Sequence, residues 1–372
     1  MQKRLYRQVF VKDIKNGMII GKDVLGSKGE ILLARGFKIT AAFTIRRLLN
    51  QHGVVLITIL REEPQQSMQK SVNEAEKIDT APYVMDDEEL AKVIDKFSDN
   101  REAIKESFDK LVRGEKVEEQ EIKEKIENTL KIFKENANVF QIMQNVKHSD
   151  DITYSHCHNV ALISYTIGRW IGLNKADLEE LVLSGMLADI GKVQIDQKLL
   201  NKKGELTNDE FVDLKKHSIL SHETIKNYDF ISDRVKKAVL HHHERVDGSG
   251  YPLGLAGKII PLFARIVAIA DVYNALVSDR PHRDKKTPFE AIKVLETEYM
   301  DKLDISILYM FLRRIASNYI GQNILLNDGT RGEIVFIPGY NIHRPVIKLQ
   351  DGGQVIDLGK EENMHLDIVE FF

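Results

Sequence analysis

The strongest constraint on the fold is a stretch of about 170 residues, 147–317, in which apolar residues recur at helical spacing. Only one glycine-rich loop, DGSGYPLGLAGKIIP, interrupts this pattern. A run of this kind folds as several helices that bury their apolar faces against one another. The sequence therefore predicts a helical bundle that carries one long loop.

The segment before the bundle has a different pattern. Residues 1–62 contain short β-branched runs that are separated by turn signals such as Asn16-Gly17. One helix is expected between Thr40, as its N-cap, and Gly53, where it stops, and a further strand follows it. These residues predict a small N-terminal α+β module, and they contain no cluster of chemically reactive side chains.

Two connecting segments and a tail complete the organisation. Residues 63–83 are polar and aperiodic and are interpreted as a linker, whereas residues 84–146 form a helical connector with dense charge. That connector either docks on the bundle or forms a dimerising stalk. Residues 318–372 hold short β-type runs split by Asp-Gly and Pro-Gly turns, which predict a small antiparallel sheet or barrel. The expected fold is mainly α, a bundle flanked by an α+β module and a β-rich module.

Composition excludes some functions. The net charge of −3 over 372 residues shows no basic excess of the kind that binds nucleic acid polymers. The single cysteine, Cys157, permits no internal disulfide, which fits a cytoplasmic protein. No window reaches the roughly 18 to 20 apolar residues that a membrane span requires, so neither a span nor a signal peptide is expected.

Histidines and aspartates recur through the predicted bundle in suggestive contexts. The candidates are His156, Asp189, His217, His242, His243 and Asp271. Imidazole and carboxylate groups are good ligands for Fe, Mn or Zn, and a cluster facing inward from several helices can hold two ions. Each residue taken alone also has an ordinary explanation, such as a surface histidine or a buried structural hydrogen bond. The adjacent histidine pair before the glycine-rich loop is the more specific signal.

Three sequence elements, taken together, carry a resemblance to a known family. They are ADIGK at 188–192, HHERVDGSGYP at 242–252 and DVYNALVSDRP at 271–281. In this order, and over a segment of about 150–315, they resemble the HD-GYP family of cyclic di-GMP phosphodiesterases. That family is a branch of the HD metal-dependent phosphohydrolases. The composition of the second element is unusual enough to make a chance match improbable.

The resemblance implies a role for each matching residue. The metal ligands would be His156, Asp189, His217, His242, His243 and Asp271. Asp189 would bridge two divalent ions, most consistent with Fe or Mn, and Lys192 would meet the scissile phosphate. The second phosphate would contact Arg280 and Arg283, and Gly250, Tyr251 and Pro252 would form the loop beside the site. Two ions close together can stabilise both the attacking and the leaving oxygen at phosphorus.

The chain departs from the family pattern at three positions. Ala188 stands where the family has the histidine of its His–Asp pair, so one ligand is missing and the occupancy of the metal site is in question. Asn274 replaces an aspartate found in many members, and Ile152 replaces a glutamate that binds a third ion in some. His158, His241 or a water molecule are the candidates to replace the lost ligand, and water is favoured.

Three functions stay open at this point. The first is a cyclic di-GMP phosphodiesterase impaired by Ala188. The second is a degenerate domain that binds cyclic di-GMP or a signalling protein without catalysis, and the third is a scaffold. Many polar residues directed into a bundle would be unfavourable without a metal or ligand, which argues against the scaffold. A homodimer through residues 84–146 is a further expectation.

Overall fold

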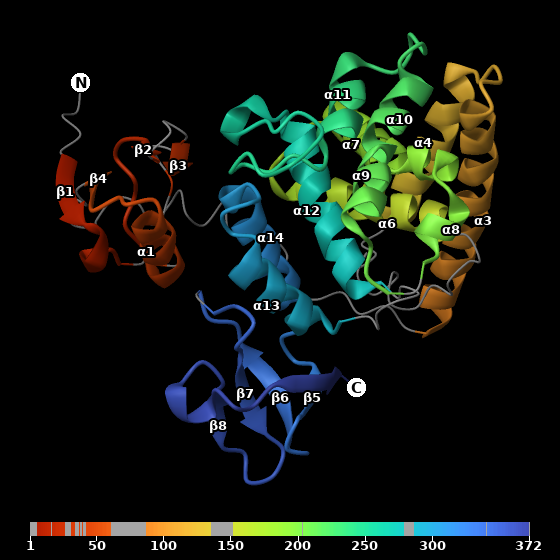
Figure 1. Ribbon diagram of the computed structural model, residues 1–372. Coiled ribbons are helices and arrows are strands. Elements are labelled where there is room, and N and C mark those ends of the chain that lie inside the picture. The colour runs from red at the N-terminus through yellow and green to blue at the C-terminus, as the bar shows by residue number, and fades with distance from the viewer. Residues whose placement is uncertain are drawn as a thin grey trace.

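The computed structural model describes residues 6–15, 17–26, 31–33, 37, 39, 42–60, 87–134, 152–202, 204–278, 286–339 and 341–371. Figure 1 shows a small N-terminal module at one side, a bundle of helices, and a β-rich module below the bundle. The observed class is the expected one: mainly helical, with strands at both ends of the chain. The domain boundaries given above stay a prediction.

The N-terminal module is built from two strand pairs and one helix. Its elements are β1 (Tyr6–Phe10), a 3₁₀ turn (Val11–Asp13), β2 (Val24–Leu25), β3 (Ile31–Leu33), α1 (Ala42–Gln51) and β4 (Leu56–Leu60). Strand β1 pairs antiparallel with β4, and β2 pairs antiparallel with β3. Helix α1 ends before Gly53, whose positive φ of 68° closes the helix as predicted. Thr40, the expected N-cap, lies outside the described residues.

The helical bundle follows two connector helices. The connector contains α3 (Asp87–Val112) and α4 (Glu119–Lys134). The bundle contains α6 (Ile152–Trp170), α7 (Lys175–Leu187), η2 (Ile190–Gln194), α8 (Gln197–Leu200), α9 (Asn208–Lys215), α10 (His217–Ile225), α11 (Asp233–His241), η3 (Gly257–Ile259), α12 (Leu262–Val277), α13 (Pro288–Glu298) and α14 (Ile305–Ser317). Helices α6, α7 and α11 pack against α12, and α10 packs against α11 (Figure 1).

Local sequence explains where these helices begin. Thr207 and Thr287 each start a helix with a capping box, in which the threonine hydroxyl and a glutamate three residues later satisfy free backbone N–H groups. Ser232 and Asp304 cap α11 and α14 through their side-chain oxygens. These caps determine where α9, α11, α13 and α14 begin.

Helix α12 is the centre of the bundle. Its sequence, LFARIVAIADVYNALV, is apolar on nearly every face, and most of its side chains are buried. A helix that is hydrophobic all round is stable only when other elements cover it completely. Asp271 and Asn274 are its buried polar residues. Such groups need partners, so α12 points to a polar site inside the bundle.

The connector helices pack against the bundle. Ile104 and Phe108 of α3 and Ile122 and Ile126 of α4 share one core cluster with Leu162 of α6. The apolar side chains that recur every three or four residues in these helices therefore cover a face of the bundle. This packing corresponds to the docking interpretation of the connector, and dimerisation through it stays a prediction.

The β-rich module forms one antiparallel sheet. Its strands are β5 (Asn323–Leu326), β6 (Arg331–Phe336), β7 (Val346–Leu349), β8 (Val355–Asp357) and β9 (Ile368–Phe371), with a 3₁₀ turn at Glu361–Asn363. The spatial order is β8-β7-β6-β5-β9. The Asp328-Gly329 turn joins β5 to β6, as the sequence predicts. Ile324 and Ile334 belong to the same core cluster as helices α12 to α14, so the sheet packs directly on the bundle.

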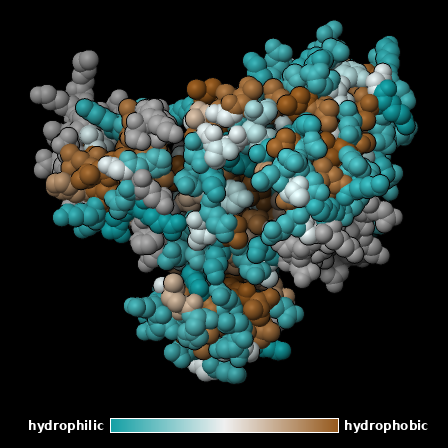
Figure 2. Space-filling view, in the orientation of Figure 1, coloured by the Kyte–Doolittle hydropathy of each residue, from teal (hydrophilic) through white to brown (hydrophobic). Residues whose placement is uncertain are grey.

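The visible surface is mostly hydrophilic, and brown atoms gather along the upper edge of the bundle (Figure 2). Among the described residues, no helix combines the length and the apolar character needed to cross a bilayer.

Candidate metal centre

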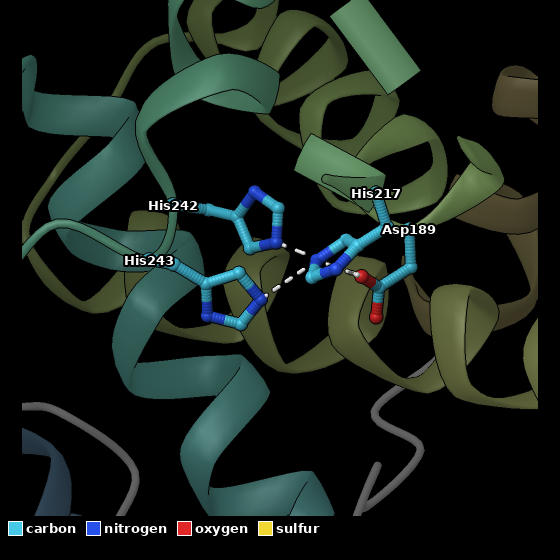
Figure 3. Close-up of side chains that lie close together, drawn as sticks. All are labelled: Asp189, His217, His242 and His243. Atoms are coloured by element: carbon cyan, nitrogen blue, oxygen red, sulfur yellow. Dashed lines mark hydrogen bonds and ion pairs between the residues drawn. The ribbon is translucent and has the colours of Figure 1, made fainter. Parts of the chain in front are cut away.

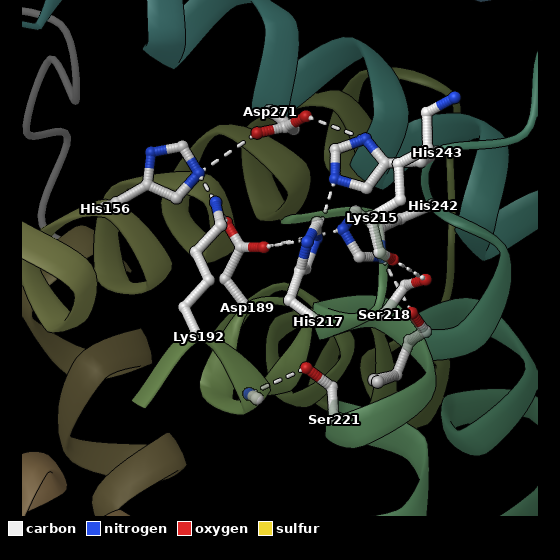
Figure 4. A network of polar contacts seen from close by, with 12 residues as sticks. His156, Asp189, Lys192, Lys215, His217, Ser218, Ser221, His242, His243 and Asp271 are labelled. Atoms are coloured by element: carbon white, nitrogen blue, oxygen red, sulfur yellow. Dashed lines mark hydrogen bonds and ion pairs between the residues drawn. The ribbon is translucent and has the colours of Figure 1, made fainter. Parts of the chain in front are cut away.

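The six predicted ligands converge inside the bundle although they come from distant parts of the chain. His156 lies on α6, Asp271 on α12, and His217 is the first residue of α10. Asp189 follows the C-cap of α7, and His242 and His243 follow the last residue of α11. Figure 4 shows these side chains directed toward one shared space.

Their ligand atoms form two groups that share one residue. Asp189, His217, His242 and His243 make up a four-ligand cluster, and His156, Asp189 and Asp271 make up a three-ligand cluster. Within each cluster the ligand atoms lie within 4.8 Å of one another. Asp189 belongs to both, so its carboxylate lies where a group bridging two ions would be. Neither His158 nor His241, the two residues considered as replacements for the lost ligand, belongs to either cluster.

The four-ligand cluster has histidines whose rings are oriented for metal binding. Nδ1 of His217 lies 2.6 Å from the carbonyl oxygen of Leu214, and Nδ1 of His242 lies 2.7 Å from that of Val239. A carbonyl oxygen only accepts, so each Nδ1 carries the proton and each Nε2 keeps a free lone pair. Carbonyl partners of this kind fix the tautomer of metal-binding histidines.

The Nε2 atoms of this cluster meet around one oxygen of Asp189. Nε2 of His217 lies 3.1 Å from Asp189 Oδ1 and 2.9 Å from Nε2 of His243. Nε2 of His242 lies 3.6 Å from the same oxygen. Figure 3 shows the three rings turned toward one another and toward the carboxylate.

Two buried atoms of this cluster lack a hydrogen-bond partner. They are Asp189 Oδ1 and His242 Nε2, and neither has a partner among the described residues. A buried acceptor without a partner costs free energy, and native proteins rarely keep one without a reason. Both atoms are ligands of the type that divalent Fe, Mn or Zn accepts. The residues therefore fit a divalent metal ion.

The three-ligand cluster is arranged differently. Nε2 of His156 lies 2.9 Å from Asp189 Oδ2 and 3.0 Å from Asp271 Oδ1. On the other side of the ring, the side-chain amide nitrogen of Asn274 donates to His156 Nδ1 at 2.7 Å. Ser278 in turn donates to the amide oxygen of Asn274 at 2.9 Å. The ring of His156 is thus held from both sides by hydrogen bonds.

Charges near Asp189 determine the protonation of the centre. Burial alone would raise the pKa of Asp189, but the positive charge of Lys192 and the hydrogen bond from His156 hold it well below its ordinary value. The ammonium group of Lys192 lies 2.6 Å from Asp189 Oδ2. Burial lowers the pKa of His217 and, further, that of His243. Near neutral pH the carboxylate is therefore ionised and both rings are neutral, the forms that bind metal.

The glycine-rich loop lies against the four-ligand cluster. The ring of Tyr251 stacks on His243 at 4.6 Å between centroids. A Cβ at Gly250 would lie 2.4 Å from the backbone nitrogen of Arg245, so only glycine lets the loop pass this close to the end of α11. Pro252 follows in a cis peptide bond. Arg280 and Arg283, the predicted contacts of the second phosphate, lie outside the described residues.

Two supporting residues were not predicted from the sequence. The buried carboxylate of Glu244 accepts hydrogen bonds from the backbone nitrogens of Leu253 and Leu255, at 2.8 and 2.9 Å, and so anchors the loop. Ser221 accepts a hydrogen bond from Gly191 N at 2.8 Å. The only sequence signal for Glu244 was its place directly after the histidine pair, and Ser221 had none.

Gly191 allows the segment that carries Asp189 to approach α10. A Cβ there would lie 2.4 Å from both the carbonyl oxygen of His217 and the backbone nitrogen of Ser221. We expect Gly191→Ala to lower the free energy of unfolding by at least about 2 kcal/mol, because backbone atoms cannot rotate away as a side chain does. Urea denaturation measures this loss.

The matched control is Ser221→Ala, which removes the hydrogen bond to Gly191 without adding an atom. Its expected cost is about 1 kcal/mol. Equal stability of Gly191→Ala and the parent chain would contradict the tight contact between the two segments.

Comparison with known proteins agrees with this geometry. A family model described as HD domain matches residues 117–307. The chain is 32% identical over 231 residues to the cyclic di-GMP phosphodiesterase PA4108 of Pseudomonas aeruginosa, covering 60% of this chain and 56% of that protein. It is 33% identical over 183 residues to the 3'3'-cGAMP-specific phosphodiesterase 1 of Vibrio cholerae, covering 49% and 42%. The chain spans about half the length of the curated relatives it matches.

A solved structure supports the fold. Bd1817, a HDG"Y"P protein from Bdellovibrio bacteriovorus, aligns with a TM-score of 0.51 at 17% identity. The alignment covers 82% of this chain and 98% of that protein. At this identity the likeness concerns the arrangement of the helices and not the reaction.

Proposed function

Because the chain belongs to the HD domain family, in its HD-GYP branch, we propose that it is a metal-dependent phosphodiesterase that hydrolyses cyclic di-GMP. Its rate is reduced by the loss of the ligand at position 188. The observation that carries this proposal is the place of Asp189, which is shared by both ligand clusters and paired with Lys192. We also propose that the protein acts in the cytoplasm and takes up two divalent ions, Fe or Mn.

The ions, when bound, would supply positive charge to the attacking and leaving oxygens at phosphorus. The chain itself supplies the rest. Lys192 adds a fixed positive charge next to Asp189, where the phosphoryl oxygens gain negative charge during the reaction. Glu244 holds the glycine-rich loop, and Tyr251 covers one face of His243 and restricts the access of water from that side. We propose that Arg280 and Arg283 bind the second phosphate, for which a guanidinium fork is well suited.

The proposed reaction cleaves one bond and forms one. A water oxygen bonds to phosphorus, the bond from phosphorus to one ribose oxygen breaks, and the proton from water ends on the released ribose hydroxyl. The product is the linear dinucleotide, and a second round would release GMP. Neither step consumes an oxidant or a reductant.

The alternative function is a sensor that binds cyclic di-GMP, or a signalling protein, without turnover. Ala188 favours it because one ligand position carries only a methyl group. The hydrogen bond from Asn274 to Nδ1 of His156 favours it as well, since it leaves the ring proton on Nε2, the atom that faces Asp189 and Asp271. A homodimer through the connector helices suits either function.

One assay separates the two functions. The full chain is loaded with Mn²⁺ or Fe²⁺, incubated with cyclic di-GMP, and the nucleotides are separated by chromatography. We expect slow formation of linear dinucleotide, reduced about 100-fold by Lys192→Met because a charge that stabilises the transition state is removed. Lys198→Met is the control, since Lys198 is exposed on α8, outside both clusters.

The outcomes are distinct. Intact cyclic di-GMP in the presence of bound ions would overturn the phosphodiesterase. Binding of the nucleotide at one site per chain without turnover would then support the sensor. A chain that neither binds nor cleaves the nucleotide would exclude both the phosphodiesterase and the sensor of cyclic di-GMP.

A further inference from the structure

We propose that the two halves of the metal centre are unequal. The four-ligand cluster holds one divalent ion tightly, whereas the three-ligand cluster is held together by hydrogen bonds and by Lys192 and takes a second ion only weakly. The proposal deepens the proposed function, since it concerns the metal centre of the same site. It is carried by three contacts that belong to this chain.

The first contact is the hydrogen bond that Nδ1 of a histidine ring makes with a backbone carbonyl oxygen. In the four-ligand cluster, backbone carbonyl oxygens accept from Nδ1 of His217 and His242, which leaves Nε2 free to bind an ion. The buried atoms without partners, Asp189 Oδ1 and His242 Nε2, are both in this cluster. This half is therefore incomplete without a cation.

The second contact reverses that arrangement in the three-ligand cluster. An amide N–H group of Asn274 donates to Nδ1 of His156, so Nδ1 carries no proton and the N–H group of the ring is at Nε2. The Nε2–H group of His156 points at Asp189 Oδ2 and Asp271 Oδ1, which lie 2.9 and 3.0 Å from Nε2. An ion bound here would have to displace this proton and break the hydrogen bond from Asn274. An aspartate at position 274 would instead accept from Nδ1 and free Nε2.

The third contact is the ammonium group of Lys192. It lies 2.6 Å from Asp189 Oδ2, the carboxylate oxygen that belongs to the three-ligand half. Oδ1 instead faces the histidines of the other half and has no hydrogen-bond partner among the described residues. Lys192 therefore competes with a second ion for the same oxygen. Like charges this close repel one another strongly in a buried site.

Ligand number favours the same conclusion. One half offers four protein ligands and the other three. The resemblance places a seventh ligand at position 188, and this chain has alanine there. The three-ligand half is thus the weaker one, because it has fewer ligands, a competing cation, and a histidine whose proton Asn274 holds on Nε2.

The test is a Mn²⁺ titration of the metal-free full chain, with free Mn²⁺ followed by electron paramagnetic resonance. We expect one ion per chain to bind tightly and a second at least about 100-fold more weakly, the upper end of the loss that follows when a supporting partner is removed. Two ions of equal affinity would overturn the proposal.

Variants identify the halves. Asp271→Asn, or His156→Gln where that variant folds poorly, should abolish the weak ion and leave the tight one unchanged. His217→Gln or His242→Gln should abolish the tight ion. Loss of the tight ion in Asp271→Asn, with native circular dichroism, would contradict the division into halves.

Two further variants address the cause. Asn274→Asp should tighten the second ion about 10- to 100-fold, because the new carboxylate accepts from Nδ1 of His156 and frees Nε2. The control is Asn274→Leu, of similar size, which neither donates nor accepts and lacks the added charge. Lys192→Met should also tighten the second ion while it lowers turnover. Unchanged binding of the second ion in both Asn274→Asp and Lys192→Met would refute the mechanism.

Failure here is distinguishable from failure of the proposed function. A chain that binds ions in the expected unequal way but leaves cyclic di-GMP intact overturns only the phosphodiesterase. A chain that cleaves cyclic di-GMP with two equally tight ions overturns only the inequality. A chain that binds no Mn²⁺ overturns both.

Discussion

Asp189→Asn is expected to remove both ions and to lower the rate of cyclic di-GMP hydrolysis by about 10³-fold or more. Loss of a single supporting partner already costs about 10- to 100-fold in metal affinity, and Asp189 is a direct ligand in both clusters. Asparagine keeps the shape of the side chain but replaces one carboxylate oxygen by an amide group that donates. Metal content after dialysis and the initial rate of nucleotide cleavage measure the effect.

The control for this substitution is Asp196→Asn, the same chemical change at the exposed N-cap of α8. Asparagine serves as an N-cap as well as aspartate does, so that variant should keep the stability and activity of the parent chain. An Asp189→Asn chain that keeps its ions would show that the other ligands hold them without the carboxylate of Asp189. That result would contradict the prediction that Asp189, as a member of both clusters, is required to bind both ions.

The sequence predicted the helical bundle correctly, and the six residues that it singled out as ligands lie close together in the structure, because both depend on patterns that are local or are carried by motifs. Their role as metal ligands stays a prediction. Apolar spacing over residues 147–317 predicted the bundle, and the structure shows α12 covered on nearly every face, with Asp271 buried within it. The turn residues of the β-rich module, such as Gly329 with its positive φ, likewise predicted where the strands reverse.

The division of the ligands into two clusters could not be predicted, because it depends on contacts between segments that are distant in sequence. His156 and Asp271 are 115 residues apart, yet their side chains lie 3.0 Å from one another. The adjacent histidines 242 and 243 would point about 100° apart on a continuing helix. Helix α11 ends at His241, and the turn that follows lets both rings join one cluster.

The direction of the hydrogen bonds around the ligands could not be predicted from the sequence either. Asn274 was noticed as a departure from the family pattern, but its effect depends on which of its two polar atoms faces His156. The role of Ser221 depends on the close approach of Gly191 to α10, which only the packed structure contains. Residues that support a ligand through a hydrogen bond are difficult to recognise in a sequence, because several residue types can make the same hydrogen bond.

Ala188→His is expected to raise the Mn²⁺ content toward two ions per chain and to increase turnover about 10- to 100-fold. The added imidazole supplies a further ligand beside Asp189, and the cluster that lacks a fourth ligand is the one with His156 and Asp271. Ala188 is buried in the core with Val160 and Ile163, so the larger side chain should also cost about 1 to 3 kcal/mol of stability. Metal analysis, the nucleotide assay and thermal unfolding measure the three effects.

Ala188→Leu separates ligation from packing, since leucine adds similar bulk in the same core without a metal ligand. It should lose stability as the histidine variant does and gain neither ion nor rate. If the histidine variant binds the second ion but stays slow, the defect lies in the hydrogen bond from Asn274 to His156, and the double variant with Asn274→Asp should then recover turnover. If the double variant also fails to gain a second ion, neither the number of ligands nor the tautomer of His156 limits the affinity of the three-ligand cluster for that ion. Lys192, paired with Asp189 at 2.6 Å, would then be the remaining cause.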